Sequence, residues 1–207
     1  MNHMEKRMKL IGLTGGIGTG KSTVSAYLSK QGWHIVDADQ ISRSMTKKGE
    51  PCLHDIRKHF GTEVFLADGT LDRKKVSSLV FNDAEKKAEL ERIVTNRVIQ
   101  EVFDRINNLK KRQKQGIIVL DAPLLFECGL KDYTDENWVV TADLESRIFR
   151  VGQRDGMDRV QIIARIANQM SSDEKAKMAD FVIDNSGSLD ALYRQLDSLI
   201  ERVDNDC

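Results

Sequence analysis

The chain has 207 residues, of which 40% are hydrophobic, and this is enough for one sizeable core. Lys and Arg together number 32, as do Asp and Glu, so the formal net charge is zero, whereas nucleic-acid-binding proteins usually carry a basic excess. No segment is long and apolar enough to span a bilayer. We therefore expect neither a nucleic acid nor a membrane as a partner.

The cysteines and the first residues bear on where the protein works. The cysteines are far apart, odd in number and without metal-ligand spacing, which predicts reduced thiols and a cytoplasmic location; they are Cys52, Cys128 and Cys207. Residues 1–8 are mostly polar and contain no signal-peptide core, and we interpret them as a short leader or an expression remnant. The domain is expected over residues 9–205, as a monomer or a weak homo-oligomer.

The strongest signal lies near the beginning of the chain. Residues 10–14 form an apolar run typical of a buried strand, residues 15–22 fit G-x-x-x-x-G-K-[ST], and a helix is expected up to Lys30. Glycines let backbone N–H groups converge on phosphates, and the helix directs its positive dipole end toward the same anion. Lys21 is expected to reach the β- and γ-phosphates, and the Ser22 hydroxyl to ligate Mg²⁺. The predicted ATP-binding residues of this loop are Gly16, Gly18, Thr19, Gly20, Lys21, Ser22 and Thr23.

A second short strand, His34–Asp37, is followed by two acids, Asp37 and Asp39. In open α/β sheets, ligands bind at the carboxyl ends of the strands. Asp39 could also cap the next helix, and the two roles are compatible. Because side chains alternate along a strand, Asp37 and Asp39 share a face. Asp39 is the predicted catalytic residue at the acceptor, and Asp37 remains the alternative.

Residues 41–115 have helical periodicity throughout. This insertion is longer than a crossover between two strands needs, so we interpret it as a helical subdomain that binds the acceptor. Its basic end, residues 110–114, fits a solvated helix terminus better than a phosphate site.

The third strand, Gly116–Asp121, is apolar and ends in an acid, in the form of a Walker B segment. Such an aspartate holds the Mg²⁺ shell, so Asp121 joins Ser22 as a predicted metal ligand. Residues 123–127 then form a loop at the same sheet edge, where Leu124 and Glu127 are candidate acceptor contacts.

A fourth strand over residues 137–142 precedes Arg147, Arg150 and Arg154, which share one face of a helix. These arginines suit either a solvated helix face or a lid that neutralises transition-state charge, and as a cluster they favour a lid over residues 147–178. A fifth strand, Phe181–Asp184, and a helix capped by Ser188 complete the chain.

The alternation of strands and helices predicts an α/β protein with a five-stranded parallel sheet flanked by helices, a P-loop NTPase fold. The core is expected over residues 9–40, 116–146 and 179–205, with the acceptor insertion over 41–115 and the lid over 147–178.

The motifs, in this order, resemble the dephospho-CoA kinase family over residues 10–199. The matching segments are L-T-G-G-I-G-T-G-K-S-T at 13–23, V-D-A-D at 36–39, D-G-T-L at 68–71, P-L-L-F-E at 123–127, Q-R-D at 153–155, Arg165 with Gln169, and A-D at 179–180 with V-I-D-N at 182–185.

The resemblance implies ATP-dependent phosphorylation of the ribose 3′-hydroxyl of dephospho-CoA, the last step of coenzyme A synthesis, with ATP as co-substrate and Mg²⁺ as cofactor. It assigns Asp39 to the acceptor hydroxyl, the helical insertion to the acceptor, and Arg154 to a lid that contacts phosphates. Asn185 would lie near the adenine. This chain has Thr95 and Asn96 where the family usually carries His-Pro, a departure that concerns acceptor contacts and not the phosphate loop.

Three other functions compete with this interpretation. Another small-molecule or nucleotide kinase would keep the loop, lid and insertion, so composition does not separate it. A GTPase switch is disfavoured, because the D-x-x-G match at 184–187 follows the last strand and no N-K-x-D segment occurs. A non-catalytic nucleotide-binding module is disfavoured because Lys21, Ser22, Asp39 and the arginines are all present.

Overall fold

A computed structural model of the chain describes residues 8–45, 47, 49–81 and 83–206. The strands are β1 (Met8–Thr14), β2 (His34–Asp37), β3 (Gly116–Asp121), β4 (Glu136–Thr141) and β5 (Phe181–Asp184). The helices are α1 (Lys21–Lys30), α2 (Ala38–Met45), α3 (Pro51–Phe60), α4 (Arg73–Phe81), α5 (Ala84–Arg112), the 3₁₀ helix η1 (Leu130–Tyr133), α6 (Leu144–Asp155), α7 (Arg159–Ala167), α8 (Ser172–Met178) and α9 (Leu189–Asp206).

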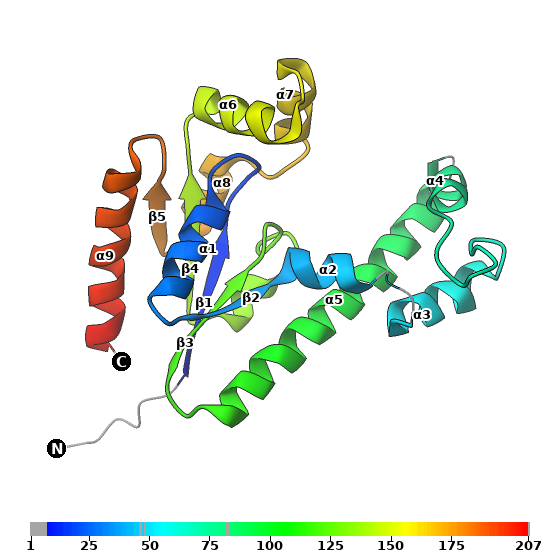
Figure 1. The fold of residues 1–207 in the computed structure, drawn as a ribbon, viewed down its shortest axis with the longest axis horizontal. Helices are drawn as coiled ribbons and strands as arrows, with labels where there is room; N and C mark the ends of the chain where they lie inside the picture. The colour runs from blue at the N-terminus through cyan, green and yellow to red at the C-terminus, as the bar shows by residue number, and fades with distance from the viewer. Residues whose placement is uncertain (1–7, 46, 48, 82, 207) are drawn as a thin grey trace. The chain divides into compact units, whose positions relative to one another are not determined.

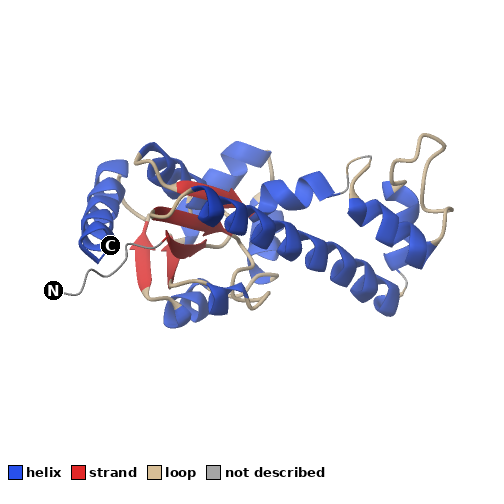
Figure 2. Ribbon diagram, turned by 90° about the horizontal axis from the view of Figure 1, so that it is seen from below, coloured by secondary structure: helices blue, strands red, loops and turns tan. Residues whose placement is uncertain are grey.

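The strands form one sheet in the order β2-β3-β1-β4-β5, with β1 in the middle (Figure 1). The register is parallel: Leu10 lies opposite Ile118 of β3, and Leu13 lies opposite Trp138 of β4. Figure 2 shows helices on both sides of these strands. A parallel sheet covered on both faces needs strands that are apolar throughout, which the runs at 10–14 and 116–120 supply. The predicted five-stranded parallel sheet is therefore confirmed.

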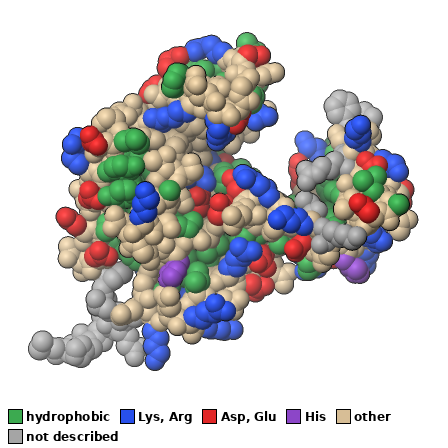
Figure 3. All heavy atoms as spheres, viewed as in Figure 1, with side chains coloured by type: hydrophobic (Ala, Val, Ile, Leu, Met, Phe, Trp, Pro, Cys, Tyr) green, Lys and Arg blue, Asp and Glu red, His purple; other side chains and the backbone are tan. Residues whose placement is uncertain are grey.

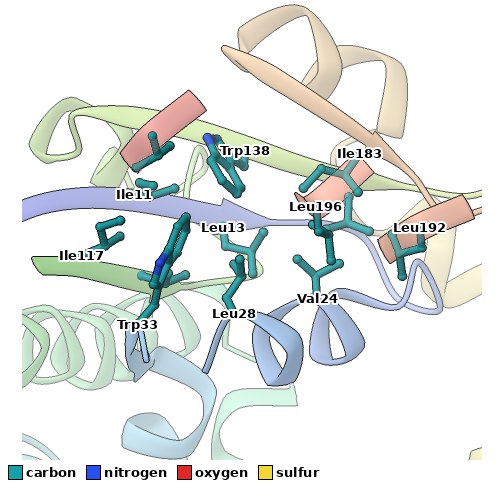
Figure 4. Close-up of a cluster of buried hydrophobic side chains, with 13 residues drawn as sticks. Ile11, Leu13, Val24, Leu28, Trp33, Ile117, Trp138, Ile183, Leu192 and Leu196 are labelled. Atoms are coloured by element: carbon teal, nitrogen blue, oxygen red, sulfur yellow. The ribbon is translucent and has the colours of Figure 1, made fainter. Parts of the chain in front are cut away.

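One face of the sheet packs against α1 and α9. Ile11 and Leu13 of β1 belong to one buried cluster with Val24 of α1 and Leu196 of α9, and all four side chains are fully buried (Figure 4). Because successive side chains of a strand alternate between faces, Gly12 faces the other side. There a Cβ atom on Gly12 would stand 2.7 Å from Leu125 Cδ2, so glycine lets the segment after β3 pack closely on β1.

The chain divides into two compact units. The described residues of Met1–Val36 and Lys110–Cys207 form the first, here called the core unit, and Asp37–Leu109 form the second, here called the helical unit. The first strand begins at Met8, which is buried, so β1 takes in the last residue of the expected leader; residues 1–7 lie outside the described part. Among the described helices, none is long and apolar enough to cross a membrane.

The helical unit is built from α2, α3, α4 and most of α5. Helix α3 begins with Pro51 in its first turn and ends at Gly61, whose φ of 79° requires glycine. The Arg97 guanidinium of α5 donates to the Asp55 carboxylate of α3 at 2.5 Å, and this bond lowers the pKa of Asp55. An ion pair between residues 42 positions apart in sequence thus joins α3 to α5.

Candidate active site

The loop between β1 and α1 holds the backbone conformation that a phosphate cradle needs. Gly18 and Gly20 have φ angles of 80° and 88°, in the left-handed region that favours glycine. Gly20 directly precedes α1, so the unpaired N–H groups of the first helical turn open at the loop. The Thr19 hydroxyl donates to the Gly16 carbonyl at 2.9 Å, which closes the loop on itself. The loop can bind an anion through its backbone alone.

Lys21 and Asp121 are brought together at the carboxyl ends of β1 and β3. The Lys21 ammonium forms an ion pair with the Asp121 carboxylate, and the two side chains are 15% and 5% exposed. Ser22 follows Lys21 and is exposed. No cluster of three or more acidic, His or Cys side chains that could hold a metal occurs among the described residues.

The arginines of α6 fall into two groups. Arg147 is buried and donates from Nε to the Ile17 carbonyl at 2.9 Å, and burial lowers its pKa. Arg150 donates to the Asn185 carbonyl at 2.7 Å. Arg154 instead pairs with the adjacent Asp155 at 2.8 Å and has a side chain that is 62% exposed. The two arginines nearest the loop are therefore Arg147 and Arg150, whereas the sequence prediction named Arg154.

Asn185 closes the loop from the end of β5. Its amide Nδ2 donates to the Thr19 carbonyl at 2.8 Å, and its side chain is 4% exposed. A Cβ atom on Gly20 would collide with that amide, which gives Gly20 a packing reason beside its positive φ. In this structure Asn185 thus holds the loop itself, and the resemblance-based expectation of a place near adenine stays a prediction.

The segment after β3 is fixed by Lys175, a residue that the sequence did not suggest. Its ammonium is 1% exposed, donates to the Pro123 carbonyl at 2.6 Å and pairs with Glu127 at 2.9 Å. The Pro123 carbonyl also accepts from the Thr14 hydroxyl at 3.0 Å. Leu124, between these fixed points, is 49% exposed and free to meet a ligand. A lysine in a polar stretch of α8 carries no sequence signal of burial.

Asp37 and Asp39 lie at the beginning of the helical unit. The Asp37 carboxylate accepts from the Gln40 N–H at 2.8 Å, so Asp37 caps α2. The expectation that Asp39 could be this cap is wrong, because Asp39 already lies inside the first turn of α2. Asp39 is half-buried, and its carboxylate has no hydrogen-bond partner among the residues that the structure describes.

Comparison with known proteins covers nearly the whole chain. The family model for dephospho-CoA kinase matches residues 9–191, which include every predicted site residue from Gly16 to Asn185. The chain belongs to the dephospho-CoA kinase family. A dephospho-CoA kinase of Carboxydothermus hydrogenoformans is 40% identical over 197 residues, 94% of each chain. One from Symbiobacterium thermophilum is 42% identical over 92% of this chain and 80% of its own length.

Solved structures share the fold of this chain. The crystal structure of TT1252 from Thermus thermophilus superposes with a TM-score of 0.78 at 34% identity, over 95% of this chain and 98% of that one. The dephospho-CoA kinase from Campylobacter jejuni, at 23% identity and a TM-score of 0.61, shares the fold.

Gln169 is one of the residues by which the sequence resembles the family, and the sequence assigned it no function. In the structure its side-chain oxygen accepts a hydrogen bond from the Ile17 N–H of the phosphate loop at 2.9 Å.

Proposed function

We propose that this protein transfers the γ-phosphoryl group of ATP to the ribose 3′-hydroxyl of dephospho-CoA, giving coenzyme A and ADP. The observation that carries this proposal is the family match, because it spans the phosphate loop, the acidic pair and the last strand together. The geometry of the core unit supports it with a preformed loop and a lysine beside an aspartate.

The loop binds the triphosphate through its backbone N–H groups. Lys21 exchanges its contact with Asp121 for the β- and γ-phosphates and neutralises the charge that develops there during transfer. Arg154, whose ion pair with Asp155 is exposed, is the arginine available to contact the phosphates from the lid. Arg147 and Arg150 are occupied by backbone carbonyls.

The residues that would hold Mg²⁺ are Ser22 and Asp121. Mg²⁺ usually takes one or two protein oxygens together with phosphates and water, so a hydroxyl and one carboxylate fit its demands. When bound, the ion screens the negative charge of the β- and γ-phosphates. Ser22 is exposed at the beginning of α1, and Asp121 forms an ion pair with Lys21 at the end of β3.

The acceptor side of the proposal depends on Asp39, Asp37, Leu124 and Glu127. Asp39 orients the ribose hydroxyl and receives its proton, because its carboxylate is not used by a hydrogen bond within the described residues. One carboxylate oxygen of Asp37 accepts the hydrogen bond that caps α2, so Asp37 is the weaker candidate for receiving the proton of the acceptor hydroxyl. Leu124, which is exposed, and Glu127, which pairs with Lys175 through one carboxylate oxygen, contact the acceptor from the segment after β3. Thr95 and Asn96 occupy α5, and we expect their acceptor contacts to differ from those of a His-Pro pair.

The test is ATP turnover with and without dephospho-CoA. We expect ADP formation to depend on dephospho-CoA and the product to be coenzyme A. Mass spectrometry would detect the added phosphate, and NMR would place it on the ribose 3′-oxygen. Nucleosides, nucleotides and shikimate serve as alternative acceptors, and GTP as an alternative donor. Equal turnover with one of those acceptors would replace the proposal with that kinase activity. A cytoplasmic location stays a prediction, supported by the free thiols of Cys52 and Cys128.

A further inference from the structure

We propose that Arg147 and Gln169 are positioning residues that hold the backbone of Ile17, in the phosphate loop, at both its N–H and its carbonyl, and so form the nucleotide cradle before ATP arrives. Arg147 lies on α6, and Gln169 lies in the turn after α7. This inference rests on the proposed function only where it is tested by enzyme kinetics; the test by hydrogen exchange does not depend on that function.

The geometry at Ile17 is two-sided. The Arg147 Nε–H donates to the Ile17 carbonyl at 2.9 Å, and the Gln169 side-chain oxygen accepts from the Ile17 N–H at 2.9 Å. Both backbone polar groups of one loop residue are thereby satisfied by side chains more than 100 positions away in sequence. The N–H of Ile17 belongs to the peptide unit before it and the carbonyl to the unit after it, so each of these two consecutive units loses a hydrogen bond if it rotates.

Burial makes the Arg147 contact specific. Its side chain is 7% exposed, and among the described residues it forms no ion pair with a carboxylate. The Arg147 guanidinium donates to two neutral oxygens, the Ile17 carbonyl and the Ser172 hydroxyl, the second at 3.2 Å. A buried cation depends strongly on such hydrogen bonds, because it has given up its water. The guanidinium is therefore aimed at the loop backbone, and burial lowers its pKa without an acid to offset the effect.

Two glycines of the motif fit around Arg147. A Cβ atom on Gly16 would stand 2.7 Å from the Arg147 Nη2 and 3.4 Å from the Gln169 side-chain oxygen. A Cβ atom on Gly18 would stand 2.7 Å from the Arg147 backbone carbonyl. Gly16 does not have a positive φ, so the packing of Arg147 and not the backbone angle explains glycine at that position. The loop sequence is matched to α6 as well as to phosphate.

The consequence is a loop that needs little ordering when the triphosphate binds. Preorganisation lowers the entropy loss on binding and acts equally on the ground state and the transition state. Removing either positioning residue should thus raise the KM for ATP and leave kcat and the KM for the acceptor nearly unchanged. A residue that contacts the transferring phosphoryl group, as proposed for Arg154, would lower kcat instead.

The first test is hydrogen exchange of the nucleotide-free full chain, read by mass spectrometry on the loop peptide. We expect Arg147→Leu and Gln169→Leu to speed exchange at residues 15–20, while peptides of α9 exchange at the wild-type rate. Gln169→Glu keeps a side-chain oxygen that can accept from the Ile17 N–H and should restore the protection. Arg159→Leu is the matched control, because Arg159 is an exposed arginine of α7 whose partner is Glu145.

The second test is kinetic. We expect each Leu variant to raise the KM for ATP about three- to tenfold, the range of one lost hydrogen bond, with kcat within about twofold of wild type. Gly16→Ala should raise the KM for ATP by displacing the guanidinium, and combining it with Arg147→Leu should add nothing further.

Unchanged loop exchange in both Leu variants would overturn the proposal, as would faster exchange throughout the chain with a normal KM for ATP, which marks a purely structural role. If the wild-type protein fails to phosphorylate dephospho-CoA, the proposed function falls, while loop exchange and binding of an ATP analogue still decide whether Arg147 and Gln169 hold the loop.

Discussion

The core unit and the helical unit use charged residues in opposite ways. Every buried polar or charged side chain in the described part of the chain lies in the core unit, and three of these side chains, Asp121, Arg147 and Lys175, are ionisable. In the helical unit the ion pairs are mostly local and partly exposed, such as Arg92 with Glu89 three residues away. Figure 3 shows both signs of charge interspersed over the visible surface, in keeping with the zero net charge.

The difference reflects what each unit has to hold. A phosphate loop must be held within a fraction of an ångström, and long-range hydrogen bonds from buried side chains supply that rigidity. A helical unit gains its stability from apolar faces and from pairs at helical spacing, each of which contributes little. Substitutions at charged residues should therefore have large effects in the core unit and small effects in the helical unit, with catalytic residues as the exception.

That exception is the largest expected effect. Asp39→Asn keeps the shape of the side chain but cannot accept the proton of the acceptor hydroxyl, so kcat should fall about a hundred- to ten-thousandfold with little change in ATP affinity. Asp37→Asn is the control, because its amide oxygen can still cap Gln40. Single-turnover rates at saturating ATP and dephospho-CoA make the comparison. A dead Asp37 variant beside an active Asp39 variant would reverse the assignment.

Lys21→Ala should lower the transfer rate on the order of a hundredfold or more, because the transferring group loses a preorganised cation. The same change leaves the buried Asp121 carboxylate without its lysine, so the melting temperature should fall too. Lys30→Ala, an exposed lysine on the same helix, is the matched control for both measurements. Wild-type turnover in a folded Lys21 variant would remove the phosphate-loop mechanism.

The sequence predicted the parts of the molecule that depend on local pattern. Strands β2, β3 and β5 begin and end at the predicted residues, because apolar runs bounded by turns and acids mark buried strands. The loop conformation followed from its glycines, and Ser188 caps the last helix by accepting from the Ala191 N–H at 3.2 Å. These features need only neighbours in sequence.

What the sequence could not predict depends on contacts between distant segments. Arg147, Arg150 and Arg154 share one helix face, yet only tertiary packing decides that the first two reach the loop and the third does not. The burial of Lys175 is of the same kind, since its partners are 48 to 52 positions away, at Glu127 and Pro123. The sequence gives the type of each of these side chains but not the direction in which it points.

Lys175→Met should lower the free energy of unfolding on the order of 3–5 kcal/mol, the effect of breaking a buried ion pair by removing one partner. Lys177→Met, an exposed lysine two residues away on the same helix, should change it by less than about 0.5 kcal/mol. Denaturant unfolding measures both. If the unpaired Glu127 carboxylate causes the loss of stability, adding Glu127→Gln to the Lys175 variant should recover part of the free energy of unfolding. No recovery would mean that the loss comes from altered packing and not from the unpaired charge.

Glu136 gives the core unit a pH dependence. Burial raises the pKa of Glu136, but hydrogen bonds from Arg202, Lys9 and Trp138 outweigh burial and lower it to about 2. The ordinary value is 4.5, so the carboxylate stabilises the fold fully above about pH 5 and loses that contribution as the pH falls toward 2. We expect Glu136→Gln to reduce stability at pH 7 by about 2–3 kcal/mol and to flatten the slope between pH 5 and 2.

The control for that slope is Glu145→Gln, whose side chain is 68% exposed in its pair with Arg159. Unfolding free energies measured by denaturant at pH 7, 4 and 3 should converge for wild type and Glu136→Gln as the pH falls. Parallel curves would show that Glu136 is not the titrating group.

The smallest effect is expected in the helical unit. Arg92 donates to Glu89 at 2.8 and 2.9 Å from one turn away on α5, and the two side chains are 60% and 32% exposed. An exposed pair at this spacing contributes about 0.2–0.5 kcal/mol, because solvent screens the charges and both side chains lose freedom. Arg92→Gln should therefore shift the free energy of unfolding by no more than about 0.5 kcal/mol, and moderate salt should remove the difference. Arg97→Gln is the contrasting variant, since Arg97 joins α5 to α3 through Asp55 at 2.5 Å and should lose more. A loss at Arg92 as large as that at Lys175 would break the distinction between the two units, because it would require a local, exposed pair to hold the helical unit as tightly as buried charge holds the core.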